Sequence, residues 1–341
     1  MAIDLAPLIA DATWLAHRFD PEGDTVHFRA VPREAHRKAT FLTDEYLGED
    51  ANPVVVRRAE ALALSPPAAP THFIFHSAFC CSTLLARAFD LPGVSMGLKE
   101  PVIVNDIVGW RHRGADGRRV AEALDHALGL LARPFEAGEA TIVKPSNVAN
   151  GLAPAMMGLR PEAKALLLSA PLPVFLKSIA KKGMWGRLWV RDLLGKQLRE
   201  GYIDLGFEPA DYLGLTDLQA AAVGWLAQHT LFARMATQFG AQRVRTLDSE
   251  TLLERPGESI GAIATLFGIV LEGGQIAEIL AGPAFATDSK TGDAFSAEER
   301  NAGYNAAAQH HADEIEKVLV WAEAVATNAG VTMEAPLPLL G

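Results

Sequence analysis

The stretch that most constrains this chain runs from residue 71 to residue 90 and reads THFIFHSAFCCSTLLARAFD. Three apolar residues at 73–75 precede a run of small residues, after which apolar residues recur at helical spacing. This order predicts a short buried strand, a tight loop and a helix that opens on two hydroxyl residues, Ser82 and Thr83. Because the free N–H groups of a helix start converge on one point, the loop is where a phosphate is expected to bind.

The same letters do not form a Walker sequence, the phosphate-binding pattern GxxxxGK[ST]. That pattern requires glycine at His76 and Cys81 and lysine at Ser82, and only Thr83 agrees with it. Without that lysine, an anion at the loop depends on backbone N–H groups, hydroxyls and cations from elsewhere in the chain. The alternative is an ordinary strand–turn–helix junction whose small residues allow close packing.

Charge and cysteine content exclude several classes of protein. The net charge of −10 argues against a general binder of nucleic acid or of an anionic membrane. No apolar run reaches membrane-spanning length, and the first residues, with an early Asp4 and no basic segment, do not resemble a signal peptide. The adjacent Cys80 and Cys81 are the only cysteines, which excludes a disulfide framework and a zinc spacing. We therefore expect a cytoplasmic protein whose partner is a small molecule, with a homodimer left open.

Residues 1–70 are predicted to form an N-terminal appendage of mixed α and β structure. A helix is expected over 7–19, a strand over 26–31 and a second helix over 32–42. The proline-rich segment 64–70 then reads as a stiff linker, since prolines extend the chain and break both helix and sheet. The sequence leaves open whether this appendage is a lid, a dimer surface or a separate subdomain.

Residues 71–341 are predicted to form one domain of the α/β class. Further apolar strands are expected at 140–143, 163–168 and 243–247. Helices are expected at 121–131, from about 171, at 216–239, 257–267 and 296–328. Continuous apolar strands separated by helices are typical of a parallel sheet that is covered on both faces.

The loop, the order of the elements and the C-terminal half together resemble the sulfotransferase family of P-loop proteins, over roughly residues 71–300. Those enzymes transfer a sulfuryl group from 3′-phosphoadenosine 5′-phosphosulfate (PAPS) to a hydroxyl or an amine. Their phosphosulfate loop reads basic-Ser-Gly-Thr-Thr, and the aligned residues here are Phe79, Cys80, Cys81, Ser82 and Thr83. The small residues and the final hydroxyls are kept, whereas the basic residue and the glycine are missing.

Later segments extend the resemblance. The family's second signature is an arginine, an Asp/Asn-Pro pair and a serine that binds the 3′-phosphate; here it aligns with Ser169, Pro171 and Ser178, so the arginine is missing. The block VRTLDSETLLERPGESIGAIATLFGI resembles the family's strand, acidic turn and helix, and the loop around Lys290 and Gly292 resembles its C-terminal phosphate loop. The resemblance implies a three-layer P-loop NTPase-like fold with a central parallel sheet and a helical C-terminal half. It also implies PAPS, or its product 3′,5′-adenosine bisphosphate (PAP), as the ligand, without a metal.

Within that resemblance, three residues are the candidates for catalysis. Lys144 directly follows a predicted strand and would replace the cation that the loop lacks, with Lys99 as the second choice. Glu100, in the LKEP segment after the loop-helix, would act as the base, so Glu100→Gln is expected to lower turnover and leave nucleotide affinity nearly unchanged. His76, at the end of the first strand, would orient a phosphate or act as a base. The alternatives are a packed histidine and an ordinary surface Lys99–Glu100 pair.

Other functions stay open at this point. A kinase or NTPase on the same scaffold lacks its Walker lysine and a clear magnesium-binding strand end. A scaffold that has lost its chemistry and binds a nucleotide or a partner would explain the losses at Phe79 and Ser169. A thiol mechanism at Cys80 and Cys81 is the fourth reading, because a helix start lowers the pKa of a thiol. The most basic window is either a solvated helix face or a patch that faces a phosphorylated ligand; it comprises Lys177, Lys181, Lys182, Arg187 and Arg191.

Overall fold

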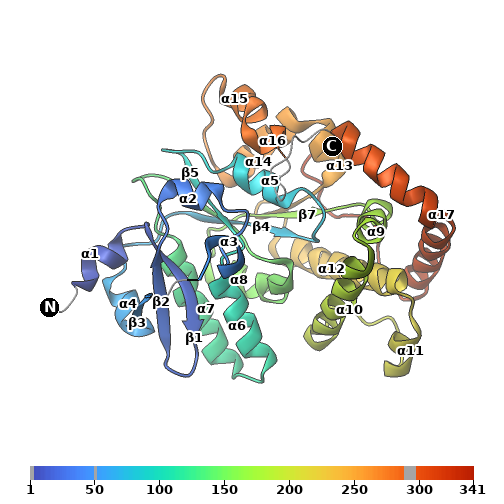
Figure 1. The fold of residues 1–341 in the computed structure, drawn as a ribbon, viewed down its shortest axis with the longest axis horizontal. Helices are drawn as coiled ribbons and strands as arrows, with labels where there is room; N and C mark the ends of the chain where they lie inside the picture. Colours follow the sequence, from blue (N-terminus) through green and yellow to red (C-terminus); the bar gives the residue numbers. More distant parts are fainter. Residues whose placement is uncertain (1–3, 50–51, 288–296) are drawn as a thin grey trace.

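A parallel sheet of five strands forms the centre of the molecule. The computed structural model of the chain describes residues 4–49, 52–287 and 297–341, the last with backbone only for 297–309. The strands of the central sheet are β4 (Thr71–His76), β5 (Ser95–Lys99), β6 (Ala140–Lys144), β7 (Ala165–Ser169) and β8 (Val244–Asp248). They are ordered β5-β6-β4-β7-β8, and every neighbouring pair is parallel (Figure 1). The predicted α/β class with a central parallel sheet is therefore confirmed.

Helices cover both faces of this sheet, which is why β4, β5 and β7 are buried along their whole length. In Figure 1, α5 (Ser82–Ala88) and α14 (Pro256–Phe267) lie on one side of it. On the other side lie α6 (Val102–His112), α7 (Gly117–Leu131), α8 (Ala153–Leu159) and α12 (Asp217–Phe239). The resulting three layers are those of the predicted fold.

The remaining elements after β6 complete the central domain. They are η1 (Asn147–Leu152), α9 (Leu172–Lys181), α10 (Gly183–Glu200), α11 (Pro209–Gly214), α13 (Ser249–Glu254), α15 (Gln275–Ala281), α16 (Pro283–Ala286) and α17 (Ala297–Asn328). The long helix α12 begins as its sequence predicts: Thr216 and Gln219 exchange side-chain and backbone hydrogen bonds at its start. The chain then returns to β8, where the backbone of Thr246 bonds Leu337 and Leu339.

The N-terminal residues form a second, antiparallel sheet of β1 (Trp14–Asp20), β2 (Thr25–Ala30) and β3 (Val54–Arg57). Its helices are α1 (Leu5–Ala10), α2 (Arg33–Lys38), α3 (Asp44–Leu47) and α4 (Arg58–Leu64). The helix predicted over 7–19 is wrong beyond residue 10, because the turn at 21–24 closes a hairpin there. Asp20 accepts hydrogen bonds from the backbone N–H groups of Glu22 and Gly23, which fixes that turn and pairs β1 with β2.

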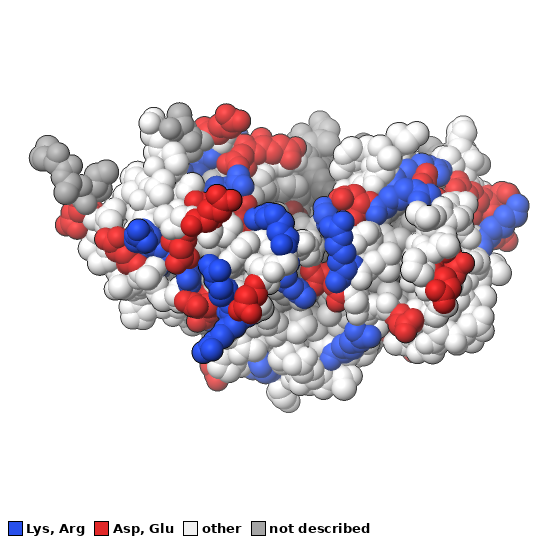
Figure 2. All heavy atoms as spheres, turned by 90° about the horizontal axis from the view of Figure 1, so that it is seen from below, with Lys and Arg blue, Asp and Glu red and all other residues white. Residues whose placement is uncertain are grey.

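An ion pair and a buried hydrogen bond join the N-terminal sheet to the central domain. The guanidinium of Arg18 binds Asp106 of α6 at 2.8 and 2.9 Å, and the buried Arg133 donates to the carbonyl of Trp14 at 2.7 Å. The division of the chain at residue 70 stays a prediction. In Figure 2, which looks at the underside of the view in Figure 1, basic and acidic side chains are interspersed across the face. That face therefore lacks a broad field of one sign.

Candidate functional site

The candidate site lies where β4 ends, at the centre of the sheet. The chain leaves β4 for β5 on one side and later forms β7 on the other side of β4. Ligands of open α/β sheets bind outside the carboxyl ends of the strands, at the point where the strand order reverses in this way. The loop of residues 77–81, between β4 and α5, lies at that point.

The backbone of this loop is strained. Ala78, Phe79 and Cys81 have φ angles of 69, 52 and 62°, in the left-handed region that L-residues rarely adopt. Cys81, aligned with the family's glycine, thus has a glycine-like conformation without being glycine. Such strain persists only where the surroundings hold it, and it clusters at functional sites.

Buried polar side chains of η1 and α12 hold the loop through hydrogen bonds to its backbone. The amide nitrogen of Asn150 donates to the carbonyl of His76 and to the side-chain oxygen of Gln228, both at 3.0 Å. Gln228 in turn donates to the carbonyl of Ser77 at 3.4 Å, and the Ser77 hydroxyl accepts from the backbone N–H of Ala170 at 3.2 Å. Asn150 and Gln228 are fully buried, so these bonds fix the loop without the help of bulk water.

The ring of His76 holds the loop as well. Its Nδ1 accepts the backbone N–H of Ala78 at 3.1 Å, and its Nε2 lies 3.1 Å from the carbonyl of Pro145. An Nδ1 that accepts carries no proton, so Nε2 carries the proton and donates it to that carbonyl. Both ring nitrogens are engaged, which makes His76 a positioning residue for Ala78 in this geometry rather than a proton acceptor.

Lys144 and Glu100 form a buried ion pair beside the loop. Lys144 is fully buried at the end of β6; its Nζ bonds Glu100 Oε1, with the hydroxyl of Thr83 at 3.4 Å. Glu100 directly follows β5, with φ of 52°, and its side chain is 16 % exposed. Its Oε1 is also 3.7 Å from His76 Nε2. The structure thus brings these four predicted residues together, while their catalytic and binding roles stay predictions.

One residue of this cluster comes from the N-terminal appendage and was missed by sequence reasoning. The Nζ of Lys144 lies 4.8 Å from the ring centroid of Phe41. The chain between Phe41 and Lys144 includes the whole of β3, β4 and β5 and several helices, and no local pattern connects the two residues. Only a covariation signal between the appendage and the strand ends could have found this contact.

Other predicted residues lie elsewhere or are engaged otherwise. Lys99, the second choice for the missing cation, donates to the carbonyls of His36 and Arg37 at 2.9 and 2.8 Å, and burial lowers its pKa to about 7. Ser178 donates to the carbonyl of Val174 within its own helix at 2.8 Å. Lys290 and Gly292 lie outside the described residues.

Two side chains of the loop, those of Phe79 and Cys80, are packed in or against the hydrophobic core. Phe79, at the place of the family's basic residue, packs edge-on against Phe175 and Trp189. Cys80 donates to the carbonyl of Leu168 at 3.5 Å, and burial raises the pKa of its thiol, opposite to what a thiol mechanism needs.

The arginines of the basic window are paired with carboxylates. Arg187 contacts Glu314 at 3.1 Å, and Arg191 binds Asp217 and, at 2.6 Å, the carbonyl of Leu215. These pairs tie α10 to α17 and to the start of α12. The two arginines therefore stabilise the packing of helices, which argues against a patch that faces a phosphorylated ligand at these two positions.

Within the described ranges, no three His, Cys, Asp or Glu side chains lie close enough together to hold a metal ion. Over the same residues, no helix is both long and apolar enough to span a bilayer.

Comparisons with known proteins give weak likenesses. No family model and no curated protein sequence matches the chain. Among solved structures, a sulfotransferase domain from the curacin biosynthetic pathway matches with a TM-score of 0.42 and 13 % identity, covering 67 % of this chain and 81 % of that one. The sulfotransferase STF9 from Mycobacterium avium matches with a TM-score of 0.42 and 12 % identity, covering 74 % and 79 %. Likenesses at this level carry no inference about chemistry, and the function proposed below depends on this chain's own residues.

Proposed function

We propose that the chain is a sulfotransferase-like enzyme that binds PAPS at residues 77–83 and transfers its sulfuryl group to a hydroxyl or amine of a small molecule. The observation that carries the proposal is the buried Lys144–Glu100 ion pair next to Thr83. Sulfuryl transfer needs a cation for the leaving phosphate and a base for the acceptor, and this pair offers both at the carboxyl ends of the strands.

The residues fit the 5′ end of the ligand better than its 3′ end. At the 5′ end, the amides of the first turn of α5 have no partner inside the helix, and Lys144 supplies the charge that is missing at Phe79. At the 3′ end, Ser169 stands in place of the family's arginine. Lys290 would have to supply that charge.

Each residue of the cluster then has one role. PAPS, when bound, supplies the activated sulfuryl group and a phosphate as its leaving group. Lys144 stabilises the negative charge that develops on the leaving phosphate oxygen, and the Thr83 hydroxyl orients the Lys144 ammonium. Glu100 accepts the proton that the acceptor's hydroxyl or amine loses. His76 keeps Ala78, and with it the loop, in place.

The ion pair also couples the two charges. As Glu100 takes up the proton it becomes neutral, so the Lys144 ammonium loses its carboxylate partner. That ammonium then interacts more strongly with the leaving phosphate, whose charge grows in the same step. Since Lys144 is fully buried, this redistribution occurs where electrostatic interactions are strong.

Ligand binding tests the proposal through thermal melting and calorimetry, with PAP compared to ATP plus magnesium. A ligand that binds only the folded state raises its apparent stability, so PAP should raise the melting temperature and ATP should not. Lys144→Met should weaken PAP binding about tenfold, because a charged donor in a desolvated site is lost. Lys196→Met is the control, as Lys196 pairs with Asp192 on the surface of α10.

The variant Glu100→Gln is a more specific test, because the structure predicts the direction in which its PAP affinity changes. The sequence alone predicts a nearly unchanged nucleotide affinity for this variant, but the ion pair implies that Lys144 becomes freer to bind an anion. We expect tighter PAP binding together with slower turnover. Stabilisation by ATP alone would favour the kinase reading, and stabilisation by neither ligand would favour a scaffold without this chemistry; both outcomes contradict the proposal.

A further inference from the structure

A pair of aromatic rings from the N-terminal appendage begins at Lys144, the buried cation of the ion pair. The ring of Phe41 covers Lys144, and the ring of Tyr46 packs edge-on against Phe41, with centroids 5.2 Å apart and planes at 88°. Phe41 is half-buried, and Tyr46, on α3, is 39 % exposed. The two rings thus lead from the buried ion pair outward to the surface.

Tyr46 also lies within electrostatic reach of the candidate base. Partial burial raises the pKa of Tyr46, and the negative charges of Glu45 and Glu100 raise it further. Contacts therefore connect Tyr46 to Phe41, Phe41 to Lys144, and Lys144 to Glu100. A molecule that brings a hydroxyl to Glu100 from this side has these rings next to it.

The main chain that bears the two rings is fixed to the central sheet. The backbone N–H of Leu42 donates to the carbonyl of Lys99 at 2.7 Å, and the carbonyl of Leu42 accepts from Val102 at 3.1 Å. Leu42 itself is fully buried. Phe41, the neighbour of Leu42, is thereby held beside Lys99, the last residue of β5, which directly precedes Glu100.

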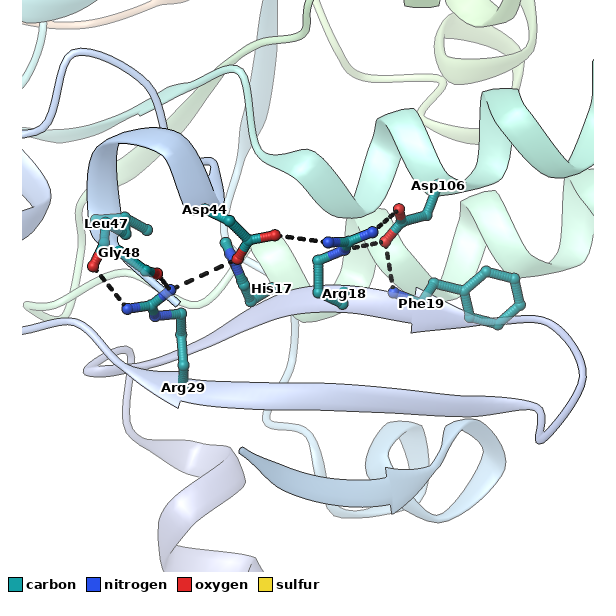
Figure 3. A network of polar contacts seen from close by, with 8 residues as sticks. All are labelled: His17, Arg18, Phe19, Arg29, Asp44, Leu47, Gly48 and Asp106. Atoms are coloured by element: carbon teal, nitrogen blue, oxygen red, sulfur yellow. Dashed lines mark hydrogen bonds and ion pairs between the residues drawn. The ribbon is translucent and has the colours of Figure 1, made fainter. Parts of the chain in front are cut away.

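Asp44 fixes the other end of the segment through the network in Figure 3. Its carboxylate bonds His17 Nε2 and the Arg18 guanidinium, each at 2.6 Å. Arg29 donates to the carbonyls of Leu47 and Gly48 at 2.9 and 2.7 Å. These bonds attach α3 to β1 and β2, and Arg18 carries the attachment on to α6, so Tyr46 stands on a rigid support.

We infer that Phe41 and Tyr46 form the acceptor wall of the site and select an acceptor with a flat apolar surface next to its hydroxyl, as in an aryl alcohol. The inference rests on the proposed function for the identity of the reaction. Aromatic rings stack with offset or edge-on geometry, and a flat molecule would cover the exposed ring of Tyr46. Covering it would also exclude water from Glu100, which strengthens the electrostatic interactions of the ion pair.

The test compares 2-naphthol with 1-decanol, an aliphatic alcohol of the same carbon number. Binding of 2-naphthol is followed by its own fluorescence, with and without PAP, and 1-decanol is used as the competitor. The wild-type protein should bind 2-naphthol at least tenfold more tightly than 1-decanol. Tyr46→Ala should weaken 2-naphthol binding about tenfold, and Tyr46→Phe should retain it, because the ring and not the hydroxyl makes the wall.

Tyr212→Ala is the matched control, since Tyr212 packs against Phe207 on α11. It should leave 2-naphthol binding unchanged, and every variant should keep its melting temperature and its PAP affinity. Equal binding of the two alcohols, no binding of 2-naphthol, or full binding by Tyr46→Ala would overturn the acceptor wall. Failure of PAP to bind would instead overturn the proposed function, and the direct binding of 2-naphthol is measured independently of it.

Discussion

Removing one partner of the Lys144–Glu100 pair should cost stability in a way that removing both does not. Breaking a buried ion pair typically costs about 3–5 kcal/mol, because a charge is left without compensation. Glu100→Gln leaves the Lys144 ammonium fully buried, but the amide oxygen still accepts a hydrogen bond, so we expect a loss of about 2–3 kcal/mol. Lys144→Met leaves a carboxylate that is 16 % exposed and partly hydrated, and should cost about 1–2 kcal/mol.

The double variant Lys144→Met/Glu100→Gln contains neither charge and should lie within about 1 kcal/mol of the wild type. Since the two single losses sum to about 3–5 kcal/mol, the coupling energy should be about 2–5 kcal/mol. Urea unfolding of the four proteins measures it, at low and at high salt. The coupling of a buried pair should persist at high salt, whereas the surface pair Lys196–Asp192 should give about 0.5 kcal/mol that salt removes. If the effects of the two single variants simply add, the ion pair is not a buried, interacting unit and the reasoning fails.

Two further predictions concern pH and backbone strain. Burial lowers the pKa values of His36, His72 and His229 to about 3, 4 and 3, so these histidines stay neutral in the folded protein. In the unfolded chain the same histidines take up protons below about pH 6.5. The free energy of unfolding is therefore highest above that pH and falls below it. Urea unfolding should show a loss of about 3–4 kcal/mol between pH 7 and 5.5, and His229→Phe should lose about 1 kcal/mol less; equal slopes for both proteins would contradict this. Cys81→Gly should stabilise the protein by about 0.5 kcal/mol because its φ of 62° suits glycine, and Cys81→Ala should bring no gain in the same melting assay. A lower melting temperature for the glycine variant would argue that the Cys81 side chain itself contributes more than the strain costs.

Local patterns explain which parts of the fold could be predicted from sequence. The strand, loop and helix at 71–90 were predicted because burial, turn and helix signals agree within one short stretch. The helix expected over 7–19 failed because the buried Leu15, Ala16 and Phe19 suit either periodicity. These residues form a strand because the hairpin turn brings them next to β2, with which they pair.

The site was predictable only where topology dictates it. Parallel strands end at one edge, and this sufficed to expect Lys144 and Glu100 near the loop. The same rule applies to Lys99, yet its side chain binds the carbonyls of α2, and no sequence signal distinguishes these two buried lysines. Phe41 and Tyr46 depend on a contact between the appendage and the central sheet, which periodicity does not reveal.

The strand order leaves β5 and β8 at the two edges of the central sheet, and segments from opposite ends of the chain contact both of them. Leu42 bonds the end of β5, while residues 337–339 run alongside β8 and exchange backbone hydrogen bonds with Thr246. An open edge strand is a template on which another molecule can add a strand, and this is a common route to aggregation. The N-terminal and C-terminal segments therefore cover the two edges of the sheet. A truncation that removes either segment would expose an edge strand and promote aggregation, even if it left every candidate catalytic residue in place.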